Sequence, residues 1–309
     1  MYNNYRIEIL FIYGGILKDK GIKKYISNLP KPLNKDIFSL FQKGIFRKRN
    51  ISVYINQRND FIFLYPFKDF NYKKYTPRVS ILNLRKYKEK LKVFENRFAR
   101  ISKFFPNKGN IIEIGGGNGK FLQICKQSLP NIKFHILEPD NETKKERTKI
   151  KWLVEHNNID ELIKNSIKFD IVMLFHTFEH IKNLDDFLFK LKKITKKNGK
   201  IIIEIPVLND PLLGLYNIKK FKEFYFSLQH PYVYSNDSFK KVIKYNKLKI
   251  KKFIPYQRYG IENHLNWLIK NKPGGNPKFK KIFSLLEQQY KNELEKSLNN
   301  DTAIIIAGI

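Results

Sequence analysis

Runs of apolar residues alternate with amphipathic stretches through most of this chain. The run at 169–176 is apolar at nearly every position, which is typical of a strand buried on both faces. Residues 183–197 predict a helix, because their apolar positions recur at helical spacing. The runs that predict strands lie at residues 111–114, 131–140, 150–155, 169–176, 200–206, 249–255 and 301–307. This alternation predicts a doubly wound, mostly parallel α/β sheet of seven strands.

The first part of the chain has a different pattern. Residues 51–56 and 61–65 predict a hairpin with a four-residue turn. Residues 80–103 predict a helix whose apolar face consists of Leu84, Tyr87, Leu91, Phe94 and Phe98. Residues 277–298 predict another helix before the last strand. The expected divisions are a small N-terminal α+β module at 1–78 and an α/β domain at 79–309, with an insert on the substrate side at 207–300.

A glycine-rich loop between a strand and a helix is the strongest single signal. It contains Gly115, Gly116, Gly117 and Gly119. Glycines let the backbone approach a ligand, and the next helix points its free N–H groups at the loop. The dinucleotide fingerprint would need a small residue at Lys120, and the P-loop would need a glycine at Ile114. The remaining pattern, E-x-G-x-G-x-G, starts at Glu113, and its carboxylate suits a ligand that carries a cationic group.

The second predicted strand ends in another acidic residue, Glu138. A carboxylate at this place can accept hydrogen bonds from both ribose hydroxyls of a nucleoside. The alternative is a solvated acid at the end of a strand.

Composition narrows the class of protein only in part. The net charge of +32 comes mostly from lysines that are spread over the whole length, without an arginine cluster of the kind that reads base edges. We interpret this charge as a solvated surface that attracts phosphorylated or nucleotide-linked small molecules, and nucleic acid stays open as a less favoured partner.

The single cysteine, Cys125, excludes an internal disulfide and suits a reducing compartment. Residues 1–8 do not resemble a signal peptide, and no run of about 18 apolar residues occurs. We therefore expect a cytoplasmic protein without a transmembrane segment, and a homodimer is left open.

The order of these motifs resembles the class I S-adenosylmethionine-dependent methyltransferases over roughly residues 95–260. The glycine loop and Glu138 match their first two motifs, and the sequences FDIV at 169–172, FEHI at 178–181 and KKNGK at 196–200 match later ones. The resemblance implies a Rossmann-like methyltransferase fold with an antiparallel last strand, and S-adenosylmethionine as the cofactor. It assigns to the cofactor site Glu113, Gly115, Gly116, Gly117, Gly119, Glu138, Pro139, Asn158, Ile159 and Phe175.

The segment after the fourth predicted strand carries the candidates for catalysis. Methyl transfer requires a base where the acceptor proton is not already acidic. His180 ranks first and His176 second, with Glu179 as a supporting partner. The alternative is that the Glu-His pair only shapes the pocket. No third ligand accompanies the two histidines in the sequence, so no metal is expected.

Two later segments carry the candidates for substrate binding. The segment at 229–235 resembles a motif of sugar- and lipid-directed members, and it contains His230 and Tyr232. Polar and aromatic residues are dense further on, at Arg258, Tyr259, Asn263, His264 and Trp267. Such residues suit a carbohydrate or a planar ring, and Arg258 suits a phosphate. Packing roles, or an interdomain or dimer contact, are the alternatives.

Three hypotheses for the function remain open. The first is methylation of a sugar or sugar nucleotide in bacterial surface-glycan synthesis, at oxygen or carbon. It follows from the motifs and from the N-terminal hairpin, which resembles that of sugar-directed members through residues 61–66 and Tyr75 but lacks the four cysteines of their zinc ribbon. The second is an RNA or protein methyltransferase, and the third is a non-catalytic scaffold that keeps the fold.

Overall fold

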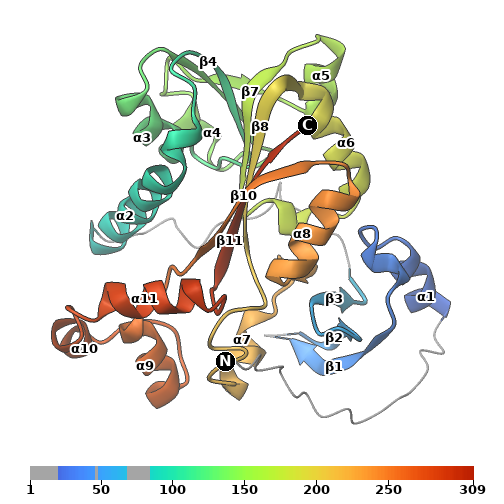
Figure 1. Cartoon of the computed structure of the whole chain (residues 1–309), viewed down its shortest axis with the longest axis vertical. Helices are drawn as coiled ribbons and strands as arrows, with labels where there is room; N and C mark the ends of the chain where they lie inside the picture. The colour runs from blue at the N-terminus through green and yellow to red at the C-terminus, as the bar shows by residue number, and fades with distance from the viewer. Residues whose placement is uncertain (1–19, 46–47, 68–83) are drawn as a thin grey trace.

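The computed structural model describes residues 20–45, 48–67 and 84–309, without the side chains of residues 84–90. Seven strands form the central sheet in the order β10-β11-β8-β7-β4-β5-β6 (Figure 1). Its strands are β4 (Gly109–Ile114), β5 (Ile132–Leu137), β6 (Val154–His156), β7 (Phe169–Phe175), β8 (Thr195–Pro206), β10 (Lys249–Tyr256) and β11 (Thr302–Gly308). β11 runs antiparallel to β8 and β10, and the pairs from β8 to β6 are parallel. The doubly wound, mostly parallel sheet is confirmed.

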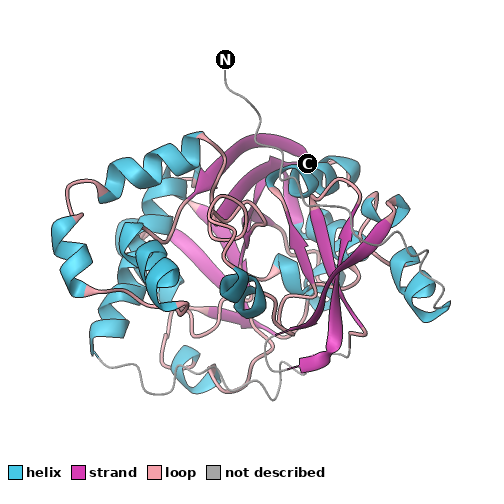
Figure 2. Ribbon diagram, turned by 90° about the horizontal axis from the view of Figure 1, so that it is seen from below, coloured by secondary structure: helices cyan, strands magenta, loops and turns pink. Residues whose placement is uncertain are grey.

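Alternate residues of the central strands face two separate cores, as the period of a strand requires. Val172 and Leu174 of β7 belong to one core, and Ile171 and Met173 belong to the other. The first core is covered by α5 (Ile159–Lys164), α6 (Leu184–Ile194) and α8 (Asn236–Tyr245). The second is covered by α2 (Leu84–Ile101) and α3 (Lys120–Ser128). Figure 2 shows helices on both sides of the strands.

The remaining helices lie at the edges and in the connections. They are α1 (Lys20–Ser27), α4 (Lys144–Arg147), α7 (Lys219–Tyr225), α9 (Ile261–Lys270), α10 (Pro277–Ile282) and α11 (Glu287–Lys296), with short 3₁₀ helices η1 (Leu33–Lys35), η3 (Ser102–Phe104) and η4 (Phe178–His180). Within the residues that the structure describes, no helix is both long enough and apolar enough to cross a membrane.

A second, antiparallel sheet contains the predicted hairpin. Its order is β1 (Phe38–Ile45), β2 (Lys48–Asn56), β3 (Phe61–Tyr65) and β9 (Tyr232–Tyr234). The hairpin between β2 and β3 is confirmed, with its turn at residues 57–60. β9 comes from the segment that the sequence assigned to the substrate-side insert, and Phe61 and Phe63 of β3 share the first core with the central sheet. The N-terminal strands are therefore joined to the rest through both pairing and packing.

Several predicted boundaries are wrong. The third strand of the central sheet is Val154–His156 rather than 150–155, because Ile150 and Leu153 close a turn instead. The helix predicted at 183–197 ends at Ile194, and Asn198 and Gly199 do not turn the chain. They lie in an irregular part of β8, where the pairing with β7 shifts between Phe169 and Ile171.

The helix predicted at 277–298 is two helices, α10 and α11. The apolar face predicted for residues 80–103 is described only from Leu91 onward, so Leu84 and Tyr87 lie outside the described side chains. Tyr75 and the N-terminal residues 1–8 likewise lie outside the described part of the chain.

Candidate active site

The glycine loop connects β4 to α3 and adopts the conformation that its residues predict. Gly115 has φ 76° and Gly117 has φ 56°, a backbone region that favours glycine. A Cβ at Gly115 would overlap the side chain of Thr177, whereas a Cβ at Gly117 would meet no atom within 4 Å. The loop is thus closely packed on the side of β7 and open at Gly117, where a ligand can approach the backbone.

Two carboxylates flank this opening. Glu138 accepts hydrogen bonds from the backbone N–H of Gly117 and of Asp140, both at 2.8 Å, and its side chain stays half-buried. Glu113 is only 3% exposed, and its Oε2 has no hydrogen-bond partner. Burial raises the pKa of Glu113 to about 8, although Arg97 opposes the increase. An open loop, a half-exposed acid and an unpaired buried carboxyl fit a nucleoside with a cationic group, as S-adenosylmethionine has.

Three of the four other residues assigned to the cofactor have visible structural roles. Asn158 is exposed and caps α5 by accepting the N–H of Glu161 at 2.8 Å. Ile159 packs against the first core, and Pro139 is exposed. Phe175 is buried, with the Arg97 guanidinium 4.5 Å from its ring centre. Contact of these four residues with the cofactor stays a prediction.

A buried ion pair lies at the carboxyl end of β8. Glu204 is fully buried and receives Arg97 from α2, with Nη2 at 2.5 Å from Oε1 and Nε at 3.0 Å from Oε2. Burial by itself would raise the pKa of Glu204, but Arg97 and His176 hold it far below its usual range. The α2 helix is thereby fixed to the sheet beside the glycine loop.

His176 extends this ion pair toward Arg258. Its Nε2 lies 3.1 Å from Glu204 Oε1 and 3.0 Å from Arg258 Nη1. That nitrogen therefore either donates to Glu204 or accepts from Arg258, depending on the tautomer. The Arg258 side chain is also paired with Asp301, whose other oxygen accepts the N–H of Arg258 and of Tyr259.

The residue after His176 connects this network to the glycine loop. Thr177 Oγ1 donates to the backbone oxygen of Ile114 at 3.2 Å, directly before Gly115. His176 itself has φ 51°, which is uncommon for a residue other than glycine and is found where the surrounding structure imposes it. The network and the glycine loop are therefore neighbours at the carboxyl edge of the sheet, where ligands bind in α/β folds.

Three further candidates, Glu179, His180 and His230, lie close together. The carboxyl group is 1% exposed and lies 3.5 Å from His176 Nδ1, and the rings of His180 and His230 are 5.1 Å apart. Burial would raise the pKa of Glu179, but His176, His180 and His230 outweigh it and hold the pKa at about 2. Burial lowers the pKa of His230 to about 4. At neutral pH this histidine is uncharged and can accept a proton or bind a cation.

The structure thus brings together five predicted residues: His176, Glu179, His180, His230 and Arg258. The other substrate candidates lie elsewhere or are packed. Tyr232 is buried in β9 against Phe61. Trp267 is buried with Phe221, and His264 is bonded to the Tyr290 hydroxyl at 2.5 Å. Asn263 bonds the backbone oxygen of Gly274, and Tyr259 is exposed beside Arg258.

The two acidic members of the network, Glu204 and Asp301, were not predicted as site residues. Each has a visible signal in the sequence. Glu204 is the only charged residue in the apolar run at 201–207, and Asp301 directly precedes the apolar run of β11. A charged residue within a buried strand requires a partner, so such positions mark a site or an internal ion pair.

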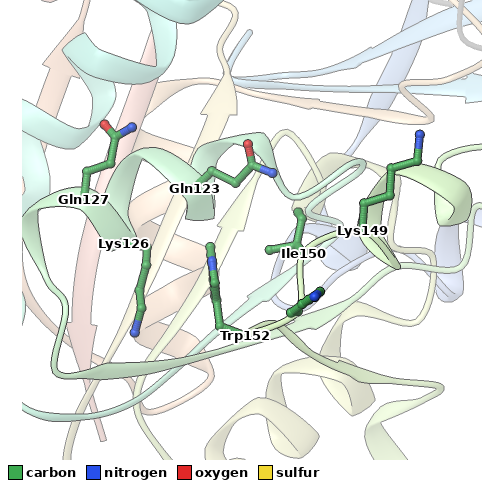
Figure 3. Close-up of a pocket in the computed structure, with 7 residues that line it drawn as sticks. Gln123, Lys126, Gln127, Lys149, Ile150 and Trp152 are labelled. Atoms are coloured by element: carbon green, nitrogen blue, oxygen red, sulfur yellow. The ribbon is translucent and has the colours of Figure 1, made fainter.

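A separate pocket lies beside α3, and its lining residues come from a different part of the sequence than the network. Figure 3 shows its lining of lysine, glutamine and apolar side chains. The residues are Gln123, Lys126, Gln127, Lys149, Ile150, Lys151 and Trp152. It shares no residue with the glycine loop or with the network around His176, so we do not assign the reaction to it.

Comparison with known proteins agrees with the motifs. The family model described as methyltransferase domain matches residues 85–250, more than half of the chain. No curated protein sequence matches the chain.

Among solved structures, a SAM-dependent methyltransferase from Archaeoglobus fulgidus is 18% identical, with a TM-score of 0.49. That match covers 73% of this chain and 99% of that chain. A possible histamine N-methyltransferase from Thermotoga maritima is 17% identical, with a TM-score of 0.46, and the match covers 72% and 92% of the two chains. Because these TM-scores lie below 0.5, neither neighbour contributes to the argument about substrate.

Proposed function

Because the chain belongs to the methyltransferase domain family, we propose that it methylates a sugar or a nucleotide-linked sugar at oxygen or carbon. S-adenosylmethionine supplies an activated methyl group when it is bound. The glycine loop, Glu113 and Glu138 are the residues that hold this cofactor. The acceptor binds on the side of Thr177 that is opposite the glycine loop. There it contacts His176, Glu179, His180, His230 and Arg258.

The observation that carries this proposal is the clustering of imidazole, carboxylate and guanidinium groups next to the glycine loop. A sugar presents several hydroxyls, and each needs a donor or an acceptor when water is removed. Glu179 and the histidines accept hydrogen bonds, whereas Arg258 donates them and carries the charge that suits a phosphate. His180 or His176 removes the acceptor proton, and the half-buried position of both rings keeps them within reach of a bound molecule.

The competing acceptors have less support. Enzymes that methylate base nitrogens resemble the pattern N/D-P-P-Y/F after the fourth strand, whereas this chain has Phe175-His176-Thr177-Phe178. The lysines that make the chain basic are spread over its length rather than collected at the network. A scaffold that no longer binds the cofactor would have no need of the unpaired buried carboxyl of Glu113.

The test is transfer of a labelled methyl group from S-adenosylmethionine to a panel of nucleotide-linked sugars, free sugars, RNA and protein. We expect label in a nucleotide-linked sugar. Replacing Arg258 by Gln should raise KM for that acceptor about 10-fold or more, since a hydrogen bond to a charged group contributes about 1.5–3 kcal/mol. Arg58→Gln is the matched control, because Arg58 pairs with Asp36 and Asp60 in the N-terminal sheet.

The outcomes separate the hypotheses. Label found only in RNA or protein contradicts the sugar proposal and supports the second hypothesis. Binding of S-adenosylhomocysteine without transfer to any acceptor in the panel supports the scaffold. A role in surface-glycan synthesis, a cytoplasmic location and a homodimer stay predictions that this assay does not address.

A further inference from the structure

Glu179, His180 and His230 form a compact group of possible metal ligands. Each offers one ligand atom, and these three atoms all lie within 4.8 Å of one another. Glu179 and His180 belong to η4, while His230 comes from the segment before β9, fifty residues later. In the sequence, only His176 and His180 have the spacing of paired ligands. The grouping of Glu179 and His180 with His230 becomes visible only in the fold.

The carboxyl group of Glu179 is the observation that points to a ligand. It is 1% exposed, and neither of its oxygens has a hydrogen-bond partner. His176 Nδ1 lies 3.5 Å from Oε1, which is within the range of an ion pair but long for a hydrogen bond. A buried carboxylate without a close hydrogen bond is costly unless a positive charge compensates it, and in the described structure only the surrounding histidines do so. A bound ion would supply the close contact that this carboxyl group lacks.

One of the two histidines, His180, is held as metal ligands commonly are. His180 Nδ1 contacts the backbone oxygen of Gln229, and a ring fixed by a carbonyl through one nitrogen presents the other nitrogen to a metal. The segment of His230 is tied to the N-terminal sheet, since the N–H of Leu64 donates to Pro231 O at 3.0 Å. Both rings are only half-buried, which leaves one side of the group accessible to a further ligand.

The spacing is close to what an ion needs. Two atoms bound to one ion at about 2.1 Å are at most about 4.2 Å apart. The group meets this limit with side-chain adjustments of less than about 1 Å. Two imidazoles and one carboxylate are the ligand set of first-row transition metals rather than of Ca²⁺ or Mg²⁺, which take oxygen ligands.

We propose that Glu179, His180 and His230 bind one divalent transition-metal ion of the class of Zn²⁺, Fe²⁺, Mn²⁺ or Co²⁺. An oxygen of the acceptor would be a further ligand of this ion, on the side that the two half-buried residues leave accessible. There the ion would polarise an acceptor hydroxyl, a role that rests on the proposed function. Binding of the ion itself does not depend on which acceptor the protein uses.

The test is metal binding by the full chain without an affinity tag. The protein is treated with EDTA and titrated with Co²⁺, whose visible absorption reports ligand number and geometry, and Zn²⁺ is then added as a competitor. We expect one equivalent of Co²⁺ with micromolar or tighter affinity, displaced by Zn²⁺. Glu179→Gln and His230→Gln should each weaken binding about 100-fold or more, since each removes a direct ligand.

His156→Gln is the matched control, because His156 contacts His135 and the ring of Phe169 and is not one of the three proposed ligands. It should bind Co²⁺ as the unmodified protein does. If the unmodified protein binds neither ion more tightly than about 1 mM, or if Glu179→Gln and His230→Gln bind like the control, the proposal is wrong. Should Glu179→Gln not fold, His230→Gln decides.

The result is independent of the proposed acceptor. Metal binding together with no methyl transfer to sugars refutes the proposed function and leaves the metal site standing. Methyl transfer to a sugar that persists in metal-free protein, together with no metal binding, refutes the metal site and leaves the function standing.

Discussion

Charged side chains buried at the carboxyl edge of the sheet are the main feature at the scale of single residues. Glu204 and Arg97 are buried together, and Glu113 lies near them without a partner of its own for Oε2. A buried pair contributes little net stability compared with apolar residues, but removing one partner leaves an uncompensated charge. Glu204 has a charged partner and Glu113 Oε2 has no hydrogen-bond partner, so mutations at the two sites should change stability in different ways.

Replacing Arg97 by Met should lower the free energy of unfolding by about 3–5 kcal/mol, because Glu204 would stay buried without its guanidinium. The double variant Arg97→Met with Glu204→Met should recover most of that loss. Urea unfolding measures both. The control is Lys220→Met, which removes the exposed pair with Glu223 and should change stability by less than about 1 kcal/mol. Equal costs for Arg97→Met and Lys220→Met would contradict this account.

Glu113 should make stability depend on pH. Its pKa is about 8 in the folded chain and 4.5 ordinarily, so between these values the folded state holds a proton that the unfolded state has lost. Stability therefore falls as pH rises through this range. Relative to the wild type, Glu113→Gln should gain stability between about pH 5 and pH 8, as measured by urea unfolding at each pH.

Glu142→Gln, at an exposed position, serves as the comparison and should show no such trend. A difference between Glu113→Gln and the wild type that stays constant with pH would show that Glu113 is ionised at neutral pH.

At the scale of elements, β9 connects two parts of the molecule. It completes the N-terminal sheet by pairing with β3, and its Tyr234 is fully buried against Phe178 of η4. The same segment carries His230, and η4 carries Glu179 and His180. The position of the histidine cluster thus depends on the packing of β9 against η4.

Two substitutions at Tyr234 should have opposite effects. The hydroxyl of Tyr234 is buried without a hydrogen-bond partner, so Tyr234→Phe should raise the free energy of unfolding by roughly 1 kcal/mol. Tyr234→Ala removes the ring from the core and should cost about 3–5 kcal/mol. Thermal and urea unfolding measure these changes. A loss of stability in Tyr234→Phe would mean that the hydroxyl is bonded after all.

At the scale of the whole molecule, the net charge of +32 dominates. Most lysines are exposed or half-buried, and acidic residues are too few to pair with them. Like charges over one surface repel one another and favour expansion of the chain. The charge is therefore a cost to the folded state at low ionic strength, whatever it contributes to attracting anionic substrates.

Raising NaCl from about 0.05 to 0.5 M should increase Tm by several degrees, because salt screens this repulsion over the Debye length. Differential scanning calorimetry measures the shift. The control is the same series near pH 10, where the net charge approaches zero and the shift should largely disappear. A Tm that falls with salt at neutral pH would mean that favourable ion pairs outweigh the repulsion.

The sequence by itself determined the central sheet and the glycine loop, because both depend on local patterns. A short, continuous apolar run such as 169–176 is typical of a buried strand, and the glycines at 115, 117 and 119 meet a local backbone requirement. Element ends were less accurate. The helix after residue 183 stopped early at Ile194, because pairing with β7 competes for the residues that follow.

The site around Glu179 was decided only by tertiary structure. His230 meets Glu179 because β9 pairs with β3, and Glu204 meets Arg97 because α2 packs across the sheet. Tyr232 and Trp267 are residue types that suit a ligand-binding site, but their side chains are buried in cores. Contacts between residues far apart in the chain depend on how whole elements pack, and no local pattern records that packing.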